Sequence, residues 1–132
     1  MEFFFDLNYS SVKGEIIIMK KALFAFNGDP MCFIHVLLNT LDMHKLGWDV
    51  KLIIEGSATA LIKNLDKEES PAGKMYREIK KKGLIDCVCR ACANKMGVLE
   101  EVEKQNLPYG DDMKGHPSFS SYINKGYDIM TF

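Results

Sequence analysis

The sequence lacks several features by which protein classes are recognised. Its 17 lysines and arginines balance 18 aspartates and glutamates, so no excess of positive charge would attract nucleic acid or an anionic membrane. No apolar run approaches the length of about 20 residues that a membrane-spanning helix requires. Phosphate-binding motifs of the G-x-G-x-x-G or Walker type do not occur, so no nucleotide or flavin cofactor is expected. We therefore predict no nucleic-acid partner, no membrane partner and no cofactor.

The amino-terminal residues also lack the marks of a secretory signal. They carry no positive charge at the start, and the run Phe3-Phe4-Phe5 is too short for the apolar region of a signal. We expect a cytoplasmic and therefore reducing compartment. Clustered cysteines in such a compartment more often react or bind metal than form structural disulfides.

Residues 1–18 differ in pattern from the rest of the chain, and Met19 precedes a clean strand pattern. We predict an amino-terminal extension at residues 1–18 and a single α/β domain at residues 19–132. Two alternatives stay open at this point. Residues 15–19 lengthen the first strand, or they pair with residues 2–5 as a hairpin.

Apolar runs and helical periodicities alternate along the domain. Strands are predicted at residues 21–27, 49–55, 84–89 and 127–132. Helices are predicted at residues 31–46, 58–65, 71–82, 90–95, 98–105 and 117–125. Residues 106–116 are predicted to form a polar loop. Strands alternating with helices indicate a mainly parallel sheet with right-handed crossovers and helices on both faces. We therefore predict a flavodoxin-like open α/β sheet of four to five strands, of which four are clear.

In open parallel sheets the reactive groups lie beyond the carboxyl ends of the strands. Three strand ends bring candidate residues to this edge: Asn27, Gly28 and Asp29 after the first strand, Glu55 after the second, and Cys89 after the third. The first three residues either line a site or only form the turn before a helix.

Residues 86–97, DCVCRACANKMG, contain three of the four cysteines: Cys87, Cys89 and Cys92. Three thiolates are soft metal ligands, but structural zinc takes four, and the next candidates, Cys32 and His116, are distant in the sequence. We therefore predict no metal. A disulfide across the Cys-x-x-Cys pair is a second interpretation, although Arg90-Ala91 stands where redox motifs usually have proline or glycine. Simple burial is the interpretation that we favour for Cys87 and Cys32.

A reactive thiol is the interpretation that we favour for Cys89. It falls at the end of a predicted strand and at the start of a helix, where free N–H groups stabilise a thiolate. Arg90 adds a neighbouring positive charge, and Cys92 shares a helical face with Cys89. His116, in the segment GHPS, either reaches these cysteines as an acid–base group or metal ligand, or lies on the surface before Pro117. The surface position is the simpler interpretation, because sequence distance gives no proximity.

Several segments of the chain from Lys20 to Phe132 resemble the DsrE/DsrF-like family of small sulfur-relay proteins. They are KALFAFNGDP, GWDVKLIIEG, VCRACANKMGV and the closing GYDIMTF. The resemblance implies a flavodoxin-like fold and a nucleophilic cysteine after the third strand, at a fixed distance before a glycine. Cys89 and Gly97 stand at that distance, and Cys92 is the second candidate.

The resemblance also implies what such a protein does. Sulfane sulfur would be carried as a cysteine persulfide between donor and acceptor proteins. The chain would assemble as a homotrimer or hexamer, or with paralogues. The alternative from the residues alone is a metal- or redox-responsive binding module without turnover, built on Cys87, Cys89 and Cys92 with or without His116.

Overall fold

The computed structural model of the protein describes residues 9–12 and 15–132. Its centre is an open five-stranded sheet in which all strands run parallel, in the order β6-β5-β4-β3-β7. The strands are β3 (Lys20–Ala25), β4 (Asp49–Ile54), β5 (Ile85–Cys89), β6 (Tyr109–Gly110) and β7 (Asp128–Thr131). The predicted flavodoxin-like α/β fold is confirmed.

The fifth strand lies inside the segment that was predicted to be a polar loop. β6 has two residues and pairs only Tyr109 with Val88 and Gly110 with Cys89. So short a strand leaves no alternating pattern for the sequence to reveal. Gly110 is required there because a Cβ would lie 2.6 Å from the Cys87 Sγ and 2.8 Å from the Pro117 Cβ.

The helices begin where their capping residues predict. They are α1 (Pro30–Lys45), α2 (Ile62–Leu65), α3 (Pro71–Lys81), α4 (Arg90–Lys95), α5 (Leu99–Lys104) and α6 (Phe119–Ile123), with a 3₁₀ helix η2 (Gly56–Leu61) before α2. The side chains of Asp29, Ser70 and Ser118 accept hydrogen bonds from backbone N–H groups in the first turns of α1, α3 and α6. The single helix predicted at residues 58–65 is thus a 3₁₀ helix followed by one α-helical turn.

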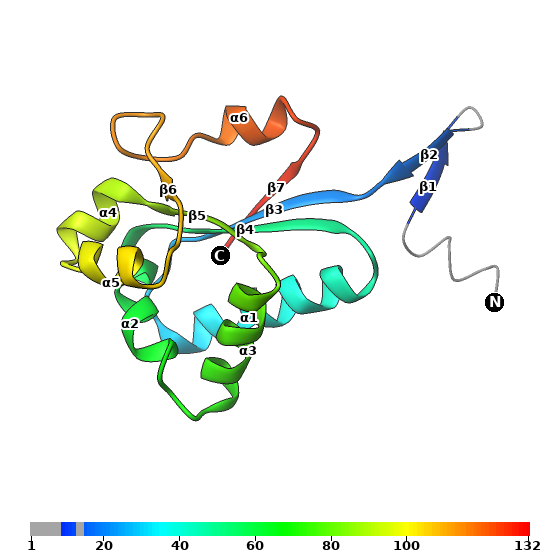
Figure 1. Ribbon diagram of the computed structural model, residues 1–132. Coiled ribbons are helices and arrows are strands. Elements are labelled where there is room, and N and C mark those ends of the chain that lie inside the picture. The colour runs from blue at the N-terminus through cyan, green and yellow to red at the C-terminus, as the bar shows by residue number, and fades with distance from the viewer. Residues whose placement is uncertain (1–8, 13–14) are drawn as a thin grey trace.

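Chain direction decides which face of the sheet each helix covers. From β3 through β4 and β5 to β6, each strand lies beside the one before it, and the sheet grows toward one edge. Right-handed crossovers therefore place the helices that connect these strands on one face. The connection from β6 to β7 returns to the opposite edge, beside β3, and therefore carries α6 over the other face. Figure 1 shows α1, α2 and α3 on one side of the sheet and α6 on the other.

The two faces differ in the size of their cores. The face covered by α1, α2 and α3 buries a large cluster that includes Leu23, Leu37, Leu52, Ile54 and Ile79. The face under α6 buries a smaller one: Ala22, Phe24, Ile53, Cys87, Tyr122 and Tyr127. A five-residue helix covers little of this second face, and the candidate site described below lies at the carboxyl edge of the sheet.

Before the sheet, β1 (Tyr9–Val12) and β2 (Glu15–Ile18) form an antiparallel hairpin in which Tyr9 pairs with Ile18. The hairpin projects from the start of β3 (Figure 1). The alternative pairing with residues 2–5 falls outside the described residues; among the described residues β2 pairs with β1. The boundary of the extension at residue 18 stays a prediction. None of the described helices combines the length and apolar character needed to span a membrane.

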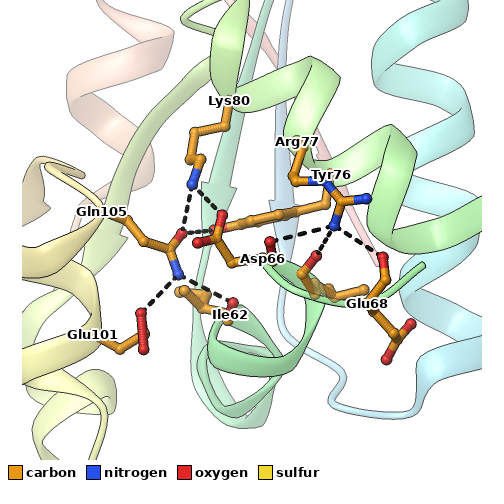
Figure 2. A network of polar contacts seen from close by, with 9 residues as sticks. Ile62, Asp66, Glu68, Tyr76, Arg77, Lys80, Glu101 and Gln105 are labelled. Carbon is orange, nitrogen blue, oxygen red and sulfur yellow. Dashed lines mark hydrogen bonds and ion pairs between the residues drawn. The ribbon is translucent and has the colours of Figure 1, made fainter. Parts of the chain in front are cut away.

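A partly buried polar network ties α2, α3 and α5 together (Figure 2). We call Asp66, Tyr76, Lys80 and Gln105 the α3 network. The Tyr76 hydroxyl donates to the Gln105 Oε1 at 2.7 Å, and Lys80 donates to the same oxygen at 3.3 Å and pairs with Asp66. The Gln105 amide donates to the Ile62 carbonyl at 3.2 Å. Burial is the main reason that the pKa of Tyr76 is raised, so its hydroxyl keeps its proton and acts as a donor.

Candidate functional site

Four side chains from separate parts of the chain converge at the carboxyl edge of the sheet. They are Glu55, Cys89, Cys92 and His116, and we call them the thiol cluster. One ligand atom from each, a carboxylate oxygen, two Sγ atoms and a histidine nitrogen, lies within 4.8 Å of all the others. All four were candidates from the sequence, and the structure brings them together.

Glu55 lies at the end of β4 and is one of the few buried acidic side chains, with 5% of its surface exposed. Its backbone N–H donates to the Ala25 carbonyl at 2.8 Å, which fixes its position beside β3. Burial raises the pKa of Glu55, while a hydrogen bond with Cys89 and the charge of His116 act in the opposite direction. The protonated form of the Glu55 carboxyl group is therefore favoured more than it is in an exposed glutamate.

Cys89 ends β5 and is fully buried. Its Sγ accepts a hydrogen bond from the Cys92 backbone N–H at 3.4 Å and lies 3.6 Å from the Gly115 carbonyl oxygen. Burial is the main cause that raises the pKa of Cys89; the hydrogen bond from the Cys92 backbone N–H acts in the opposite direction, and the Cys92 thiol and the Glu55 carboxyl group raise the pKa further. The expectation of a resting thiolate is therefore wrong, because burial outweighs the helix start.

Arg90 does not supply the positive charge that the sequence placed beside Cys89. Its side chain is half exposed, and its Nε lies 3.8 Å from the Asp111 carboxylate. Its guanidinium also stacks over the Tyr109 ring at 4.4 Å. Arg90 thus points toward β6, and the nitrogen that contacts the Cys89 Sγ belongs to His116.

His116 is the residue whose position the sequence indicated least. Its Nδ1 lies 3.1 Å from the Cys89 Sγ, 3.8 Å from the Cys92 Sγ and 3.9 Å from the Glu55 Oε1. An imidazole nitrogen in contact with a thiol is the arrangement in which histidine acts as a base for a nucleophilic sulfur.

A tight hairpin turn holds His116 in place. Met113 and His116 exchange backbone hydrogen bonds of 2.7 and 3.0 Å. Between them Lys114 and Gly115 both have positive φ, 50° and 91°, as a type I′ turn requires. The Ala91 N–H donates to the Gly115 carbonyl at 2.8 Å, which fastens the turn to the start of α4. The backbone of Lys114 and Gly115 therefore sets the distance between His116 and Cys89.

The structure places the remaining candidates outside the thiol cluster. The Asn27 Oδ1 accepts a hydrogen bond from the Asp29 N–H, the Gly28 N–H donates to the Ser57 Oγ, and Asp29 caps α1. A Cβ at Gly28 would lie 2.7 Å from the Ser57 carbonyl oxygen. These three residues form the turn between β3 and α1.

Cys87 is likewise separate from the cluster. Its Sγ lies 3.4 Å from the Tyr122 hydroxyl in the small core under α6. Burial raises the pKa of Cys87 to about 11, so its thiol is protonated and packed. Cys32 lies on α1, and the structure has all four cysteines as free thiols.

An open cavity of about 550 Å³ adjoins the cluster. Its lining includes Phe26, Met113, Pro117 and Phe119, with Glu55 and His116 on the side of the cluster. This cavity has no signal in the sequence, because Met113 and Phe119 are isolated apolar residues in a loop and a short helix. Only the fold brings them beside Phe26, which follows β3.

Comparisons with known proteins agree with the resemblance seen in the sequence. The DsrE/DsrF-like family matches residues 17–132. An uncharacterized protein of Methanocaldococcus jannaschii is 34% identical over 96 residues, which cover 73% of this chain and 76% of the relative. An uncharacterized protein of Archaeoglobus fulgidus is 45% identical over 42 residues, 32% of this chain and 69% of the relative.

No solved structure matches the chain at a significant level. The family match, by contrast, spans the whole sheet from β3 to β7 and all four residues of the thiol cluster. The chain therefore belongs to the DsrE/DsrF-like family.

Proposed function

We propose that the protein is a sulfur carrier that accepts sulfane sulfur on Cys89 as a persulfide and passes it to a partner protein. The observation that carries the proposal is the 3.1 Å contact between the Cys89 Sγ and the His116 Nδ1 at the carboxyl end of β5. Membership of a family associated with sulfur relay supports the same role. The 550 Å³ cavity beside Glu55 and His116 leaves room for the end of a donor or acceptor side chain.

The chemistry starts from the thiol form of Cys89, whose pKa is raised by burial. His116 takes the proton as the Cys89 sulfur attacks the outer sulfur of a donor persulfide, R–S–SH. One S–S bond breaks and another forms, the electron pair of the broken bond leaves with the donor sulfur, and His116 returns the proton to that thiolate. The products are Cys89–S–SH and R–SH, with no net oxidation. A thiolate of the acceptor then attacks the outer sulfur of the persulfide and restores Cys89.

Cys92 is the second candidate for the sulfur-carrying residue. Its Sγ lies 3.8 Å from the same His116 Nδ1, and its side chain is less buried than that of Cys89. A histidine shared by two thiols can take a proton from either one. Sulfur accepted on Cys89 could thus move to Cys92 on its way to the acceptor.

The role requires protein partners and a reducing compartment. We propose sulfur-donor and sulfur-acceptor proteins as partners, in the cytoplasm, and a homotrimer, hexamer or complex with paralogues as the assembled form. The exposed side chains of Met113, Phe119 and Ile123, beside the cavity and on α6, support a surface that meets another chain. Light scattering of the full chain tests the assembly, and a monomer at all concentrations would contradict it.

The test of the function is peptide mass mapping of the reduced protein after incubation with a small persulfide donor. Added mass of one sulfur is expected on the peptide of Cys89, alone or shared with Cys92. Cys89→Ser should lower total loading at least tenfold, and Cys87→Ser is the matched control that removes a buried thiol two residues away. Equal loading of Cys89→Ser and the parent would contradict the role of Cys89, and no loading on any cysteine would overturn the function.

A further inference from the structure

The thiol cluster contains the ligand types and number of a tetrahedral zinc site. Two thiolates, an imidazole nitrogen and a carboxylate oxygen are all ligands that zinc takes in proteins. In the sequence three cysteines cluster, and no fourth ligand lies close to them. In the structure the Cys87 Sγ contacts the Tyr122 hydroxyl and is not one of the clustered ligand atoms. Glu55 and His116 supply the third and fourth ligand atoms beside Cys89 and Cys92.

The distances between the donor atoms lie within about 1 Å of those in a tetrahedral zinc site. Bonds of about 2.3 Å to sulfur and 2.0–2.2 Å to nitrogen and oxygen imply donor–donor edges of roughly 3.3–3.8 Å. The edges from the His116 Nδ1 are 3.1 Å to Cys89, 3.8 Å to Cys92 and 3.9 Å to Glu55. All donor atoms are within 4.8 Å of one another. Small side-chain rotations would therefore place one ion at bonding distance from all four.

We propose that Glu55, Cys89, Cys92 and His116 bind one Zn²⁺ ion, and that the bound ion prevents sulfur transfer. The second half of this inference rests on the persulfide role proposed above, whereas the metal site itself does not. Binding releases one proton from each thiol and changes no oxidation state. With its electron pair bound to the metal, the Cys89 sulfur cannot attack a donor persulfide.

The surroundings of the cluster support a preformed site. The Cys92 N–H already points at the Cys89 Sγ, a contact that favours a metal-bound thiolate. The turn at Lys114 and Gly115 is fastened to α4, so His116 keeps its place without the ion. Arg90, the cation next to Cys89 in the sequence, directs its guanidinium to the Asp111 carboxylate and the Tyr109 ring. The adjoining cavity, which Glu55 and His116 line, gives the ion a route to the buried cysteines.

The metal site is tested on the full chain, reduced and stripped of metal under anaerobic conditions, with Co²⁺ as the probe. One equivalent should produce sulfur-to-cobalt charge-transfer absorption and the visible bands of a tetrahedral ion, and Zn²⁺ should displace them. Glu55→Gln and His116→Ala should each weaken Co²⁺ binding at least tenfold, and Cys32→Ser, which removes a thiol on α1, should leave it unchanged. Absence of charge-transfer absorption in the folded parent, or equal binding by Glu55→Gln and His116→Ala, would overturn the site.

Sulfur loading with and without one equivalent of Zn²⁺ separates the two proposals. Loading of the metal-free protein that falls at least tenfold with zinc supports both. Metal binding without sulfur loading in either state overturns the carrier function and leaves the metal site. Sulfur loading without metal binding overturns the metal site and leaves the carrier function. Loading that persists on the zinc-bound protein overturns the inhibition.

Discussion

The α3 network and the thiol cluster are two groups of polar side chains in the same small domain. They differ in how the charges and hydrogen-bond donors of each group are paired with acceptors. In the α3 network the charge of Lys80 meets Asp66, and the Tyr76 hydroxyl donates to Gln105 (Figure 2). In the thiol cluster two thiols and a carboxyl group, all of which lose protons, meet a single imidazole. Buried polar groups that are fully paired stabilise a fold, whereas buried groups that are only partly paired call for another explanation, such as a catalytic role or a bound ion.

The comparison separates structural from functional residues without knowledge of the substrate. The α3 network pairs its donors with acceptors, and it joins residues of α3 with the ends of α2 and α5. The thiol cluster lies at the edge where parallel sheets build their sites. Substitutions should therefore lower stability in the first group, and change function or raise stability in the second.

The largest effect on stability is expected from Gly73→Ala, at the helix that carries the α3 network. A Cβ there would lie 2.1 Å from the Glu68 carbonyl oxygen, and the Arg77 guanidinium donates to the same oxygen at 2.9 Å. The loop cannot move away without breaking that hydrogen bond, so we expect a loss of about 3 kcal/mol in the free energy of unfolding. Urea denaturation measures it.

The matched control for Gly73→Ala is Gly83→Ala. Gly83 has a φ of 71° and no atom within 4 Å of the added Cβ, so only backbone strain of about 1 kcal/mol is expected. Losses of equal size in the two variants would contradict a steric clash at Gly73.

A smaller loss is expected when one hydrogen bond of the α3 network is removed. Tyr76→Phe keeps the fully buried ring and deletes the hydroxyl that donates to Gln105 at 2.7 Å. Lys80 still donates a hydrogen bond to the same Gln105 oxygen at 3.3 Å, so that oxygen keeps a partner. We therefore expect the free energy of unfolding to fall by about 1 kcal/mol. Urea denaturation measures this loss, and the dependence of the unfolding free energy on urea concentration should stay unchanged. Stability equal to that of the parent would mean that the hydrogen bond does not stabilise the fold.

Much of the fold could be predicted because the signals are local. The apolar runs of β3, β4 and β5, and the capping residues Asp29 and Ser70, lie where the elements begin and end. The parallel sheet then brings Glu55 and Cys89 to one edge without further information. β6 could not be predicted, because a strand of two residues is too short to show the alternation of apolar and polar residues.

The thiol cluster could be predicted only in part, because its last member depends on tertiary structure. His116 lies 27 residues from Cys89 along the chain, and the type I′ turn at Lys114 and Gly115 brings it back to α4. The protonation of Cys89 was mispredicted for a related reason. Helix starts are visible in a sequence, whereas the full burial of Cys89 is a property of the folded chain.

The smallest expected effect is that of Glu55→Gln, and its sign distinguishes the thiol cluster from the α3 network. The substitution should raise the free energy of unfolding, whereas substitutions in the α3 network should lower it. Burial raises the pKa of Glu55 above its ordinary value of 4.5, so its carboxylate is less stable in the folded chain than in the unfolded chain at neutral pH. Glu55→Gln should therefore raise the free energy of unfolding at pH 7, and because the open cavity screens the charge, the expected gain is about 0.5 kcal/mol. Below pH 4.5 the carboxyl group is protonated in both states, so the gain should disappear there and return as pH rises through the folded-state pKa.

The measurement is chemical denaturation at several pH values with a chelator present, so that no metal contributes. Asp66→Asn, in the α3 network, is the control of opposite sign: it deprives Lys80 of its partner and should lower stability at pH 7 by about 0.5 kcal/mol. If Glu55→Gln instead lowers stability at pH 7, the carboxylate of Glu55 is satisfied by its own neighbours. The thiol cluster would then be a second structural network, and the case for a ligand between its four side chains would lose its electrostatic basis.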